Sequence, residues 1–286
     1  MCGIAGLWNK KQAVQASILA PALTRMRHRG PDDEGFLVIE TTSGTATPLG
    51  GDDTPGELTL PSWRHSDAVQ GQIVLGHRRL SILDLSPRGH QPMRSADGKA
   101  WIVFNGEVYN YIELREELRS AGHQFHSGSD TEVILHAWQQ WGEACLDRFN
   151  GDWALCIADL SEAEPRLFLA RDRYGIKPLF FADTSDTFWF ASEAKALIGP
   201  AVPFQPRELA VLRFLQSGEL PSGYGTDPFF EGIQQLAPGE SMHVTASGIT
   251  KRRWYDLRQA SSKIATPDEA TALREMTAQV DSAVKL

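Results

Sequence analysis

The sequence contains few cysteines, and they show no regular spacing. The three are Cys2, Cys145 and Cys156, an odd number without a Cys-x-x-Cys pair. Such a set does not describe a disulfide framework, and it lacks the paired spacing of structural zinc sites. The sequence therefore predicts neither a disulfide-rich secreted domain nor a zinc module. A reducing cytoplasm, which keeps thiols free, fits this cysteine usage.

A long hydrophobic run and a surplus of positive charge are also missing. No apolar stretch approaches the roughly 20 residues of a membrane-spanning helix. The first residues do not show the basic-then-apolar layout of a signal peptide. The formal net charge of -8 disfavours a nucleic-acid partner, because phosphate binding depends on clustered Lys and Arg. We therefore expect a cytoplasmic protein that binds neither membranes nor nucleic acids.

Motifs for metals and nucleotides are absent from the sequence as well. The eight histidines show no His-x-x-x-His spacing with a nearby acid. Neither a phosphate loop of the Gly-x-x-x-x-Gly-Lys type nor a dinucleotide fingerprint occurs. We therefore expect no metal site and no cofactor in this chain.

Apolar residues are plentiful, at 42% of 286 residues, which is enough for a sizeable core. Short apolar runs between turn residues predict strands over 3–8, 36–40, 73–83, 101–104, 153–160, 166–170, 179–182 and 187–191. Apolar residues at helical spacing predict helices over 17–27, 111–121, 131–141 and 208–216. This pattern is typical of an α+β protein with antiparallel sheets.

Two segments stand outside this pattern. Residues 41–72 are rich in Thr, Gly, Asp, Ser and Pro, which predicts a long loop or insertion. Near the C-terminal end, the capping box Thr-Pro-Asp-Glu at 266–269 predicts a helix. Its apolar stripe of Leu273, Met276, Val280 and Val284 must be buried against something. We therefore divide the chain into a domain over 1–258 and a linker with a helix over 259–286.

Cys2 is the first candidate for chemistry, because removal of Met1 would leave a thiol and a free α-amine on one residue. The reference pKa is about 7.7–8.0 for the amine and about 8.5 for the thiol, so moving the proton between them costs only about 1 kcal/mol. This is the N-terminal form of nucleophile activation. The alternative is a cysteine that stands at position 2 by chance, and on Cys2 alone that alternative is the stronger one.

Asn105-Gly106-Glu107 follows a predicted strand. The Asn105 side-chain amide and the Gly106 N–H could both donate hydrogen bonds to the oxyanion that forms when an amide carbonyl is attacked. The alternative is an ordinary Asn-Gly hairpin turn, which is the commoner role for this dipeptide taken alone.

Two charged residues would suit an amino-acid substrate. Arg79, on a predicted strand, could bind a carboxylate through two parallel hydrogen bonds, or it could belong to a solvated basic strand edge. Asp130, where a helix is predicted to begin, could hold an ammonium group or could be the helix N-cap. A thiol, an oxyanion hole and these two groups together fit an amino acid with a side-chain amide.

In combination, these motifs resemble the glutaminase domain of glutamine-dependent asparagine synthetase, a class II amidotransferase of the N-terminal-nucleophile (Ntn) hydrolase fold. The matching stretches occur in family order at 1–6, 27–32, 76–86, 89–93, 104–110, 128–133, 170–179 and 191–197. Arg79-Leu-Ser-Ile and Asn105-Gly-Glu-Val-Tyr-Asn are similar to this branch rather than to the amidotransferases that make glucosamine phosphate or phosphoribosylamine. Cys2 distinguishes the chain from β-lactam synthetases, which resemble this branch without its nucleophile.

The resemblance implies a four-layer αββα sandwich with two stacked antiparallel sheets. It also implies that Cys2 attacks the side-chain carbonyl of glutamine, and that Asn105 and the Gly106 amide form the oxyanion hole. The other implied contacts hold the substrate: Arg79 binds its carboxylate, Glu107 and Asp130 receive its ammonium, and backbone groups near Leu80, Ile82 and Leu83 line the pocket.

One family motif is missing. The Ser-Gly-Gly-x-Asp-Ser loop that cradles ATP pyrophosphate in the family's second domain does not occur in this sequence. We therefore expect ATP and Mg to belong to a synthetase domain outside this chain, and 259–286 to be the linker and first helix of that domain. The expected function is glutamine hydrolysis to glutamate and ammonia through a Cys2 thioester, as the ammonia-supplying half of an asparagine synthetase.

Three alternatives stay open at this stage. The chain could be a non-catalytic or partner-dependent amidotransferase-like module. It could instead supply ammonia for the amidation of another carboxylate. The unpartnered stripe on the last helix also leaves a homodimer or a partner chain as possible assemblies.

Overall fold

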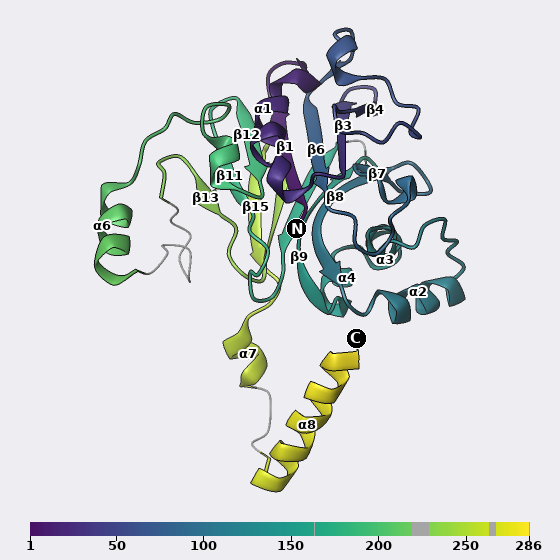
Figure 1. The fold of residues 1–286 in the computed structure, drawn as a ribbon, viewed down its shortest axis with the longest axis vertical. Coiled ribbons are helices and arrows are strands. Elements are labelled where there is room, and N and C mark those ends of the chain that lie inside the picture. The colour runs from purple at the N-terminus through teal and green to yellow at the C-terminus, as the bar shows by residue number, and fades with distance from the viewer. Residues whose placement is uncertain (163, 219–228, 263–266, 286) are drawn as a thin grey trace.

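Two antiparallel β-sheets carry most of the buried apolar side chains. The structure, a computed structural model, describes residues 1–162, 164–218, 229–262 and 267–285. Successive residues of a strand point to opposite faces of the sheet, so a sheet that is apolar on both faces has to be covered on both. Here the two sheets pack against each other, and helices cover their outer faces (Figure 1).

The first sheet has seven strands in the spatial order β13-β11-β12-β1-β6-β3-β4. Each neighbouring pair is antiparallel. The strands are β13 (Gln234–Gln235), β11 (Phe180–Asp183), β12 (Thr187–Ala191), β1 (Gly3–Asn9), β6 (Ile73–Arg79), β3 (Asp33–Glu40) and β4 (Thr45–Gly50).

The second sheet has six strands in the order β15-β14-β10-β9-β8-β7, again with antiparallel neighbours. These are β15 (Gly248–Arg253), β14 (Glu240–Thr245), β10 (Arg166–Arg171), β9 (Gly151–Asp159), β8 (Ala100–Val108) and β7 (Met93–Arg94). A separate two-stranded pair joins β2 (Val14–Gln15) to β5 (Gln70–Gly71).

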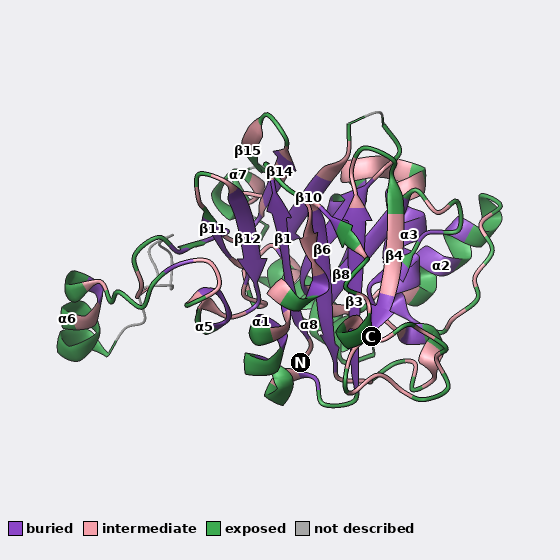
Figure 2. Ribbon diagram, turned by 90° about the horizontal axis from the view of Figure 1, so that it is seen from above, coloured by how far each residue is buried: buried purple, intermediate pink, exposed green. Residues whose placement is uncertain are grey.

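Helices form the two outer layers. Side chains of α1 (Ala20–Arg25) and α5 (Ala194–Leu197) share a core with the first sheet, and those of α2 (Tyr111–Ser120), α3 (Asp130–Trp141) and α4 (Cys145–Arg148) share one with the second. A third core lies between the sheets. Figure 2 shows the result: the strands are mostly buried, α1 and α2 carry exposed residues, and α3 is mostly buried. The α+β fold and the four-layer αββα sandwich are therefore confirmed.

Helical turns connect these layers. Five short 3-10 turns lie at η1 (Ala16–Ile18), η2 (Arg27–Arg29), η3 (Trp63–His65), η4 (Pro87–Gly89) and η5 (Gly142–Ala144) in the described part of the chain. The single helix predicted over 17–27 is wrong, because that stretch is divided into η1, α1 and η2. Pro21 lies in the first turn of α1, where its missing N–H costs nothing, and it marks the start of the α-helical part.

The loop predicted over 41–72 is wrong in its first part. Residues 45–50 form β4, which pairs with β3 from Glu40↔Thr45 to Gly35↔Gly50. As an edge strand, β4 is only partly buried and tolerates the Thr and Pro residues that suggested a loop. Gly44, with a φ of 69°, supplies the left-handed conformation that the connecting turn needs.

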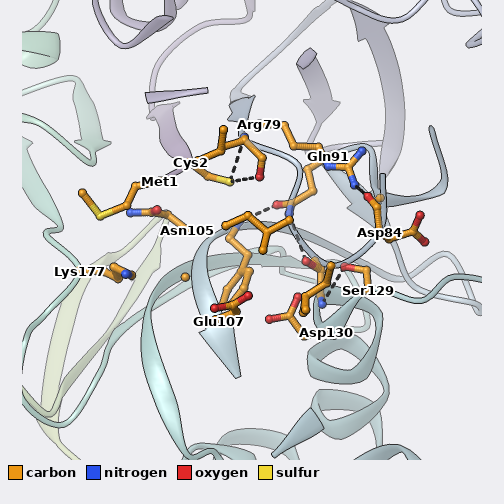
Figure 3. Close-up of a pocket in the computed structure, with 17 residues that line it drawn as sticks. Met1, Cys2, Arg79, Asp84, Gln91, Asn105, Glu107, Ser129, Asp130 and Lys177 are labelled. Atoms are coloured by element: carbon orange, nitrogen blue, oxygen red, sulfur yellow. Dashed lines mark hydrogen bonds between the residues drawn. The ribbon is translucent and has the colours of Figure 1, made fainter. Parts of the chain in front are cut away.

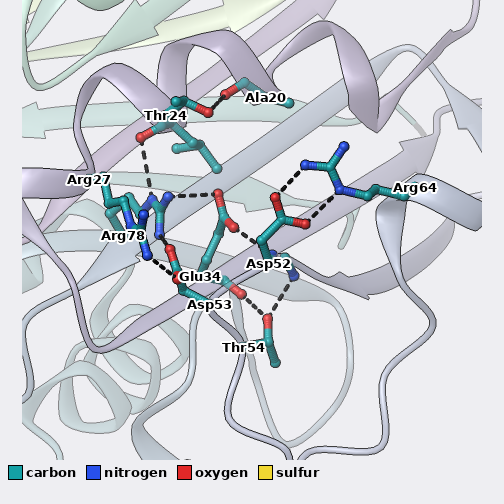
Figure 4. Close-up of polar contacts among 11 residues, drawn as sticks. Ala20, Thr24, Arg27, Glu34, Asp52, Asp53, Thr54, Arg64 and Arg78 are labelled. Carbon is teal, nitrogen blue, oxygen red and sulfur yellow. Dashed lines mark hydrogen bonds and ion pairs between the residues drawn. The ribbon is translucent and has the colours of Figure 1, made fainter.

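A network of ion pairs attaches the part of the insertion that follows β4 to the first sheet and its neighbouring helical turn (Figure 4). Arg78 is buried at 3% exposure, and its guanidinium pairs with Glu34 at 3.3 Å and with Asp53. Arg27 also pairs with Asp53, at 2.7 Å, and Asp52 binds the exposed Arg64. Burial raises the pKa of Glu34, and the charge of Arg78 opposes that effect. The insertion is therefore an anchored part of the domain.

Three helices lie outside the four layers, namely α6 (Glu208–Ser217), α7 (Leu257–Ser261) and α8 (Glu269–Lys285). In α8, Asp268 caps the first turn through the Thr271 N–H at 2.9 Å, while Thr266 of the expected capping box lies outside the described residues. The apolar stripe of α8 is exposed by 57–83%. The division at residue 258 stays a prediction. Among the described residues, no helix has the length and hydrophobicity needed to cross a membrane.

Candidate active site

Cys2 precedes β1, a central strand of the first sheet, and its backbone is held from two sides. The Arg29 guanidinium donates to the Cys2 carbonyl at 2.8 Å and pairs with Glu193 at 3.0 Å. Two residues after Cys2, the Ile4 N–H donates to the Ser192 hydroxyl, and the Ser192 N–H donates to the Ile4 carbonyl. These contacts leave the Cys2 side chain directed toward the end of the neighbouring strand β6.

The sulfur of Cys2 contacts the backbone of Leu80. The Leu80 N–H donates to Sγ at 3.4 Å, and the thiol donates to the Leu80 carbonyl at 3.6 Å. Burial raises the pKa of the Cys2 thiol, while the Leu80 hydrogen bond, the N-terminal amine and Arg79 act in the opposite direction. A proton acceptor close to the sulfur is therefore needed to form the thiolate near neutral pH.

The N-terminal amine, whose charge interacts with that of Cys2, is the candidate for this acceptor. Burial lowers its pKa; the charge of Cys2 opposes this effect, and Arg29 and Lys177 add to it. A lowered pKa keeps a larger fraction of the amine unprotonated at neutral pH, and only that form can accept a proton. In the described chain this amine belongs to Met1, one residue before the thiol.

Every residue that the sequence predicted for the site lines one cavity of about 80 Å³ (Figure 3). A buried water needs about 10–15 Å³ of such space, so a small polar molecule fits in the cavity. The predicted residues that it brings together are Cys2, Arg79, Leu80, Ile82, Leu83, Asn105, Gly106, Glu107 and Asp130. They come from the residue before β1, from β6, β8 and α3, and from the segment after β6.

Asn105 and Gly106 lie inside β8, opposite Ala154 and Trp153 of β9, so the hairpin-turn alternative is wrong. The Asn105 side chain is 0% exposed, and both of its amide atoms lack a hydrogen-bond partner among the described residues. An unpaired buried amide costs about 1–3 kcal/mol, which makes it a poor structural group and a ready donor for a ligand. Gly106 has no room for a side chain, because a Cβ would lie 2.2 Å from the Asp152 carbonyl.

Two carboxylates, those of Glu107 and Asp130, lie on one side of the cavity (Figure 3). Asp130 is the first residue of α3 and accepts the Val108 N–H at 3.0 Å. The N-cap is Ser129, which accepts the Thr131 N–H at 3.1 Å, so the N-cap alternative for Asp130 is wrong. Burial, together with the neighbouring charge of Glu107, raises the pKa of Asp130 to about 6. A buried carboxylate beside a half-buried one favours binding of a positive group.

Arg79 ends β6, and its side chain is buried rather than part of a solvated strand edge, so that alternative is wrong. Its guanidinium donates to the carbonyl of Ser86 at 2.9 Å and to the carbonyl of Asp84. These bonds hold the segment after β6, which the strand prediction over 73–83 had wrongly included. Since a guanidinium has five N–H donors, Arg79 keeps donors for a ligand.

The segment after β6 forms one wall of the cavity. Leu80, Ile82 and Leu83 line it, and the Ile82 and Leu83 side chains are also exposed to solvent. The Asp84 carboxylate fixes this wall to the opposite side by accepting the Gly128 N–H at 2.9 Å. This wall of the cavity is therefore partly apolar, and the hydrogen bonds of Arg79 and Asp84 hold it in place.

Sequence reasoning missed several residues that line the cavity. Gln91 accepts the Phe104 N–H at 2.7 Å and donates to Thr131 Oγ1 at 3.2 Å, so it connects β8 to α3. Lys177 approaches from the opposite side (Figure 3). The others that were missed are Met1, Asp84, Gly89, Phe104, Ser129 and Thr131. Five of the missed residues are adjacent in sequence to a predicted site residue. The other three, Gly89, Gln91 and Lys177, lie within the stretches at 89–93 and 170–179 that carry the resemblance.

The backbone of residues 172–177 presents Lys177 to the cavity. The buried Asp172 carboxylate accepts the N–H groups of Tyr174, Ile176 and Lys177, each at 3.0 Å. Arg171 donates to the Lys177 carbonyl at 2.7 Å. Burial lowers the pKa of Arg171 to about 10, which leaves it charged at neutral pH. This turn is held by charged groups that do not themselves line the cavity.

The described residues offer no metal centre. In the described ranges, no group of three or more His, Cys, Asp and Glu side chains is arranged to hold a metal ion. The expectation that this chain needs no cofactor stays a prediction.

Comparisons with known proteins give a consistent result. Residues 63–255 match a family model described as a glutamine amidotransferase domain. Asparagine synthetase [glutamine-hydrolyzing] 3 of Bacillus subtilis is 31% identical over 281 residues, which cover 96% of this chain and 40% of that protein. A putative asparagine synthetase of Mycobacterium tuberculosis H37Rv is 32% identical over 304 residues, covering 99% of this chain and 41% of that protein. The chain thus spans about two fifths of the length of these relatives.

Solved structures show the same fold. Glutamine phosphoribosylpyrophosphate amidotransferase from B. subtilis superposes with a TM-score of 0.64 at 20% identity, covering 89% of this chain and 49% of that one. A class-II domain protein from Silicibacter pomeroyi gives 0.51 at 12% identity, covering 89% of this chain and 100% of that one. At these identities the likeness concerns the fold alone.

Proposed function

Because the chain belongs to the glutamine amidotransferase domain family, we propose that its cavity hydrolyses the side-chain amide of L-glutamine to glutamate and ammonia. One observation carries the proposal: the Cys2 sulfur and the unpaired, buried Asn105 amide line the same small cavity. A nucleophile and a preorganised donor on either side of one space are what attack on an amide carbonyl requires.

The substrate is held by groups of complementary charge. Arg79 takes the α-carboxylate with the guanidinium N–H donors that the Asp84 and Ser86 carbonyls leave free. Glu107 and Asp130 take the α-ammonium on the carboxylate side of the cavity. With both ends of the amino acid fixed, the side-chain amide lies against Cys2, and this positioning alone lowers the barrier.

The chemistry begins once Met1 is removed and the amine belongs to Cys2. The thiol proton moves to this amine, directly or through one water, and the sulfur forms a bond to the amide carbon. The oxyanion receives hydrogen bonds from Asn105 Nδ2 and the Gly106 N–H. The C–N bond then breaks, the amine returns its proton to the leaving nitrogen, and ammonia departs. Water hydrolyses the thioester by the same route in reverse, which frees glutamate and the thiol.

The finer assignment is the ammonia-supplying half of an asparagine synthetase. Two findings support it: the names of the curated relatives, and the 40% of their length that this chain spans. ATP and Mg would then act in a synthetase domain or chain, to which the exposed stripe of α8 would bind, or α8 would pair with a second copy. Another carboxylate acceptor stays an alternative, since acceptor recognition lies outside this cavity. A cytoplasmic location would keep the Cys2 thiol reduced.

The direct test is ammonia release from L-glutamine by the purified chain. We expect Cys2→Ala to abolish it, whereas Cys145→Ala, which removes a buried cysteine that does not line the cavity, should leave it unchanged. Intact mass should show the loss of Met1 in active protein. Equal ammonia release by wild type and Cys2→Ala would remove the mechanism. Retention of Met1 in an inactive protein would favour the non-catalytic module instead.

A further inference from the structure

The segment that leads into Asp130 is held almost entirely by side chains from other elements. Residues 126–129 form no helix or strand, yet the Glu132 carboxylate accepts the N–H groups of His126 and Ser127, both at 2.8 Å. The Asp84 carboxylate accepts the next N–H, that of Gly128, at 2.9 Å. Because this backbone is fixed group by group, the position of Asp130 follows from the side chains that hold it.

Arg115 binds the carbonyl groups of the same segment. From α2, its guanidinium donates to the Ser127 carbonyl at 2.6 Å and to the Ser129 carbonyl at 2.8 Å. The Ser129 carbonyl is part of the peptide unit that joins Ser129 to Asp130. One hydrogen bond from Arg115 therefore fixes the orientation of the peptide that immediately precedes the carboxylate-bearing residue.

Arg115 is a buried residue that holds neighbouring backbone in place, unlike a solvent-exposed arginine. Its side chain is buried, and its guanidinium lies 4.8 Å from the centroid of the Phe125 ring. Among the described residues, its hydrogen bonds go to backbone carbonyls, and its Nε is buried without a partner. Burying a cation whose charge is compensated only by carbonyls and an aromatic ring is unfavourable in free energy. An apolar residue would therefore stabilise the fold more if the role were purely structural.

Arg115 does not belong to the described lining of the cavity, so it does not touch the substrate itself. What it controls is the Asp130 carboxylate, which already carries a raised pKa of about 6 because of burial and of Glu107. A carboxylate that binds an ammonium group must keep both its place and its direction, since a misplacement of about 1 Å can cost a large part of the binding.

We propose that Arg115 is a positioning residue that makes the cavity selective for substrates with an α-ammonium group, because it fixes the Ser129–Asp130 peptide and with it the Asp130 carboxylate. The inference rests on the proposed function of this cavity. It predicts a loss that depends on one group of the substrate, whereas general damage to the fold would affect every substrate alike.

The test compares L-glutamine with 4-carbamoylbutyrate, which is glutamine without its α-amine. For Arg115→Met we expect kcat/KM for L-glutamine to fall about 10- to 100-fold, mainly through KM, since a hydrogen bond to a charged group contributes about 1.5–3 kcal/mol. For 4-carbamoylbutyrate we expect a change below about threefold, because that substrate makes no use of Asp130. Arg115→Lys keeps the positive charge but can bind only one of the two carbonyls at a time. Its kcat/KM for L-glutamine should therefore lie between those of wild type and Arg115→Met.

The chain offers a matched control in Arg119, one turn further along α2. Its guanidinium lies over the same Phe125 ring at 5.7 Å, but it pairs with Glu116 at 2.6 Å and not with the loop. Arg119→Met should leave both substrates unaffected. In an Asp130→Asn background, Arg115→Met should cause no further loss with L-glutamine, because the group that it positions has already been neutralised.

Several outcomes would overturn the inference. Equal losses for both substrates would show general damage, and so would losses that add to those of Asp130→Asn. If Arg115→Met does not fold by circular dichroism, the same comparison on Arg115→Lys decides. If wild type releases no ammonia, the proposed function fails. The inference is then tested by calorimetric binding of L-glutamate against glutarate, where an unchanged preference in Arg115→Met would refute it.

Discussion

The sulfur of Cys2 lies between the two backbone polar groups of Leu80, 3.4 Å from its nitrogen and 3.6 Å from its oxygen. The carbonyl accepts the proton of the neutral thiol, and the N–H stabilises the thiolate, so each protonation state has a partner in the same residue. Leu80 directly follows Arg79, the residue assigned to the substrate carboxylate. Two consecutive residues of one segment thus serve the site: Leu80 contacts the nucleophile, and Arg79 provides the carboxylate-binding guanidinium.

Replacing Asn105 with Ala should impair catalysis without destabilising the protein. Loss of one oxyanion donor lowers kcat about 10²- to 10³-fold. The amide that is removed is buried without a partner among the described residues, so its deletion should leave the free energy of unfolding unchanged or raise it. Steady-state kinetics and urea unfolding of one preparation check both parts. A stability loss with normal kcat would contradict the assignment.

Gly106→Ala should damage both folding and activity. The new Cβ would lie 2.2 Å from the Asp152 carbonyl and 2.5 Å from Trp153 Cα, so β8 and β9 would have to separate locally. Overpacking of this kind costs about 1–3 kcal/mol. The matched control is Gly56→Ala, where an added Cβ meets nothing within 4 Å. Thermal melts that do not distinguish the two variants would argue against this close approach.

Asp130 should make the protein less stable as the pH rises from about 4 to about 6. Its pKa is about 6 when folded and about 3.9 in an unfolded chain, so the folded state binds the proton more tightly in this range. The difference corresponds to about 3 kcal/mol of destabilisation, complete above pH 6. In Asp130→Asn this contribution disappears, so the variant should exceed wild type in stability at pH 7 by up to that amount and by much less near pH 4.

Urea unfolding at several pH values measures this effect. Asp281→Asn, which neutralises an exposed carboxylate of α8, serves as the control and should show little change at any pH. A second variant tests the cause: Glu107→Gln removes a like charge and should reduce the pH dependence. If Asp130→Asn is less stable than wild type at pH 7, the carboxylate is stabilised by contacts other than those described.

Arg78→Met should be far more harmful than Arg64→Met. The Arg78 side chain is 3% exposed, and its removal leaves Glu34 buried without its counter-charge, a change that typically costs about 3–5 kcal/mol. The Arg64 side chain is 54% exposed in its pair with Asp52, and such surface pairs contribute at most about 1 kcal/mol. The loss in Arg78→Met should shrink at low pH, where Glu34 binds a proton and no longer needs a counter-charge.

Chemical denaturation of both variants at pH 7 and pH 4.5 measures these differences. Similar losses in the two variants would show that the buried network contributes no more than its exposed edge. Limited proteolysis adds a local readout, because cleavage within residues 51–65 should accelerate in Arg78→Met before the rest of the domain unfolds.

The sequence predicted most of the fold because its periodicity is local. Apolar runs such as 153–160 and 166–170 correspond to strands within one or two residues. The failures have physical causes. β4 lies at an edge, where a strand can contain Thr and Pro, and α3 begins with two adjacent residues, Ser129 and Asp130, that can both cap a helix.

The site could be predicted where one motif carries the chemistry, as in Cys2, Arg79 and Asn105. Lys177 and Gln91 lie within the stretches that carry the resemblance, but no local pattern assigns them to the cavity, because packing between segments far apart in sequence places them there. Arg115 shows the same limit. It lies on α2 without any motif, and its relation to Asp130 appears only when Ser129 is seen to accept its hydrogen bond.

Arg78 and Arg79 are neighbours on β6, and they point in opposite directions. One neutralises acids on the helix-covered face, and the other reaches the cavity. A slip of this strand by a single residue would exchange the two, leaving the acids without their cation and the ligand pocket without its anchor. Both the ion pairs of Arg78 and the position of Arg79 at the cavity therefore depend on the register of β6. Deleting one residue from it should be more damaging than deleting several from the surface turn at 41–44.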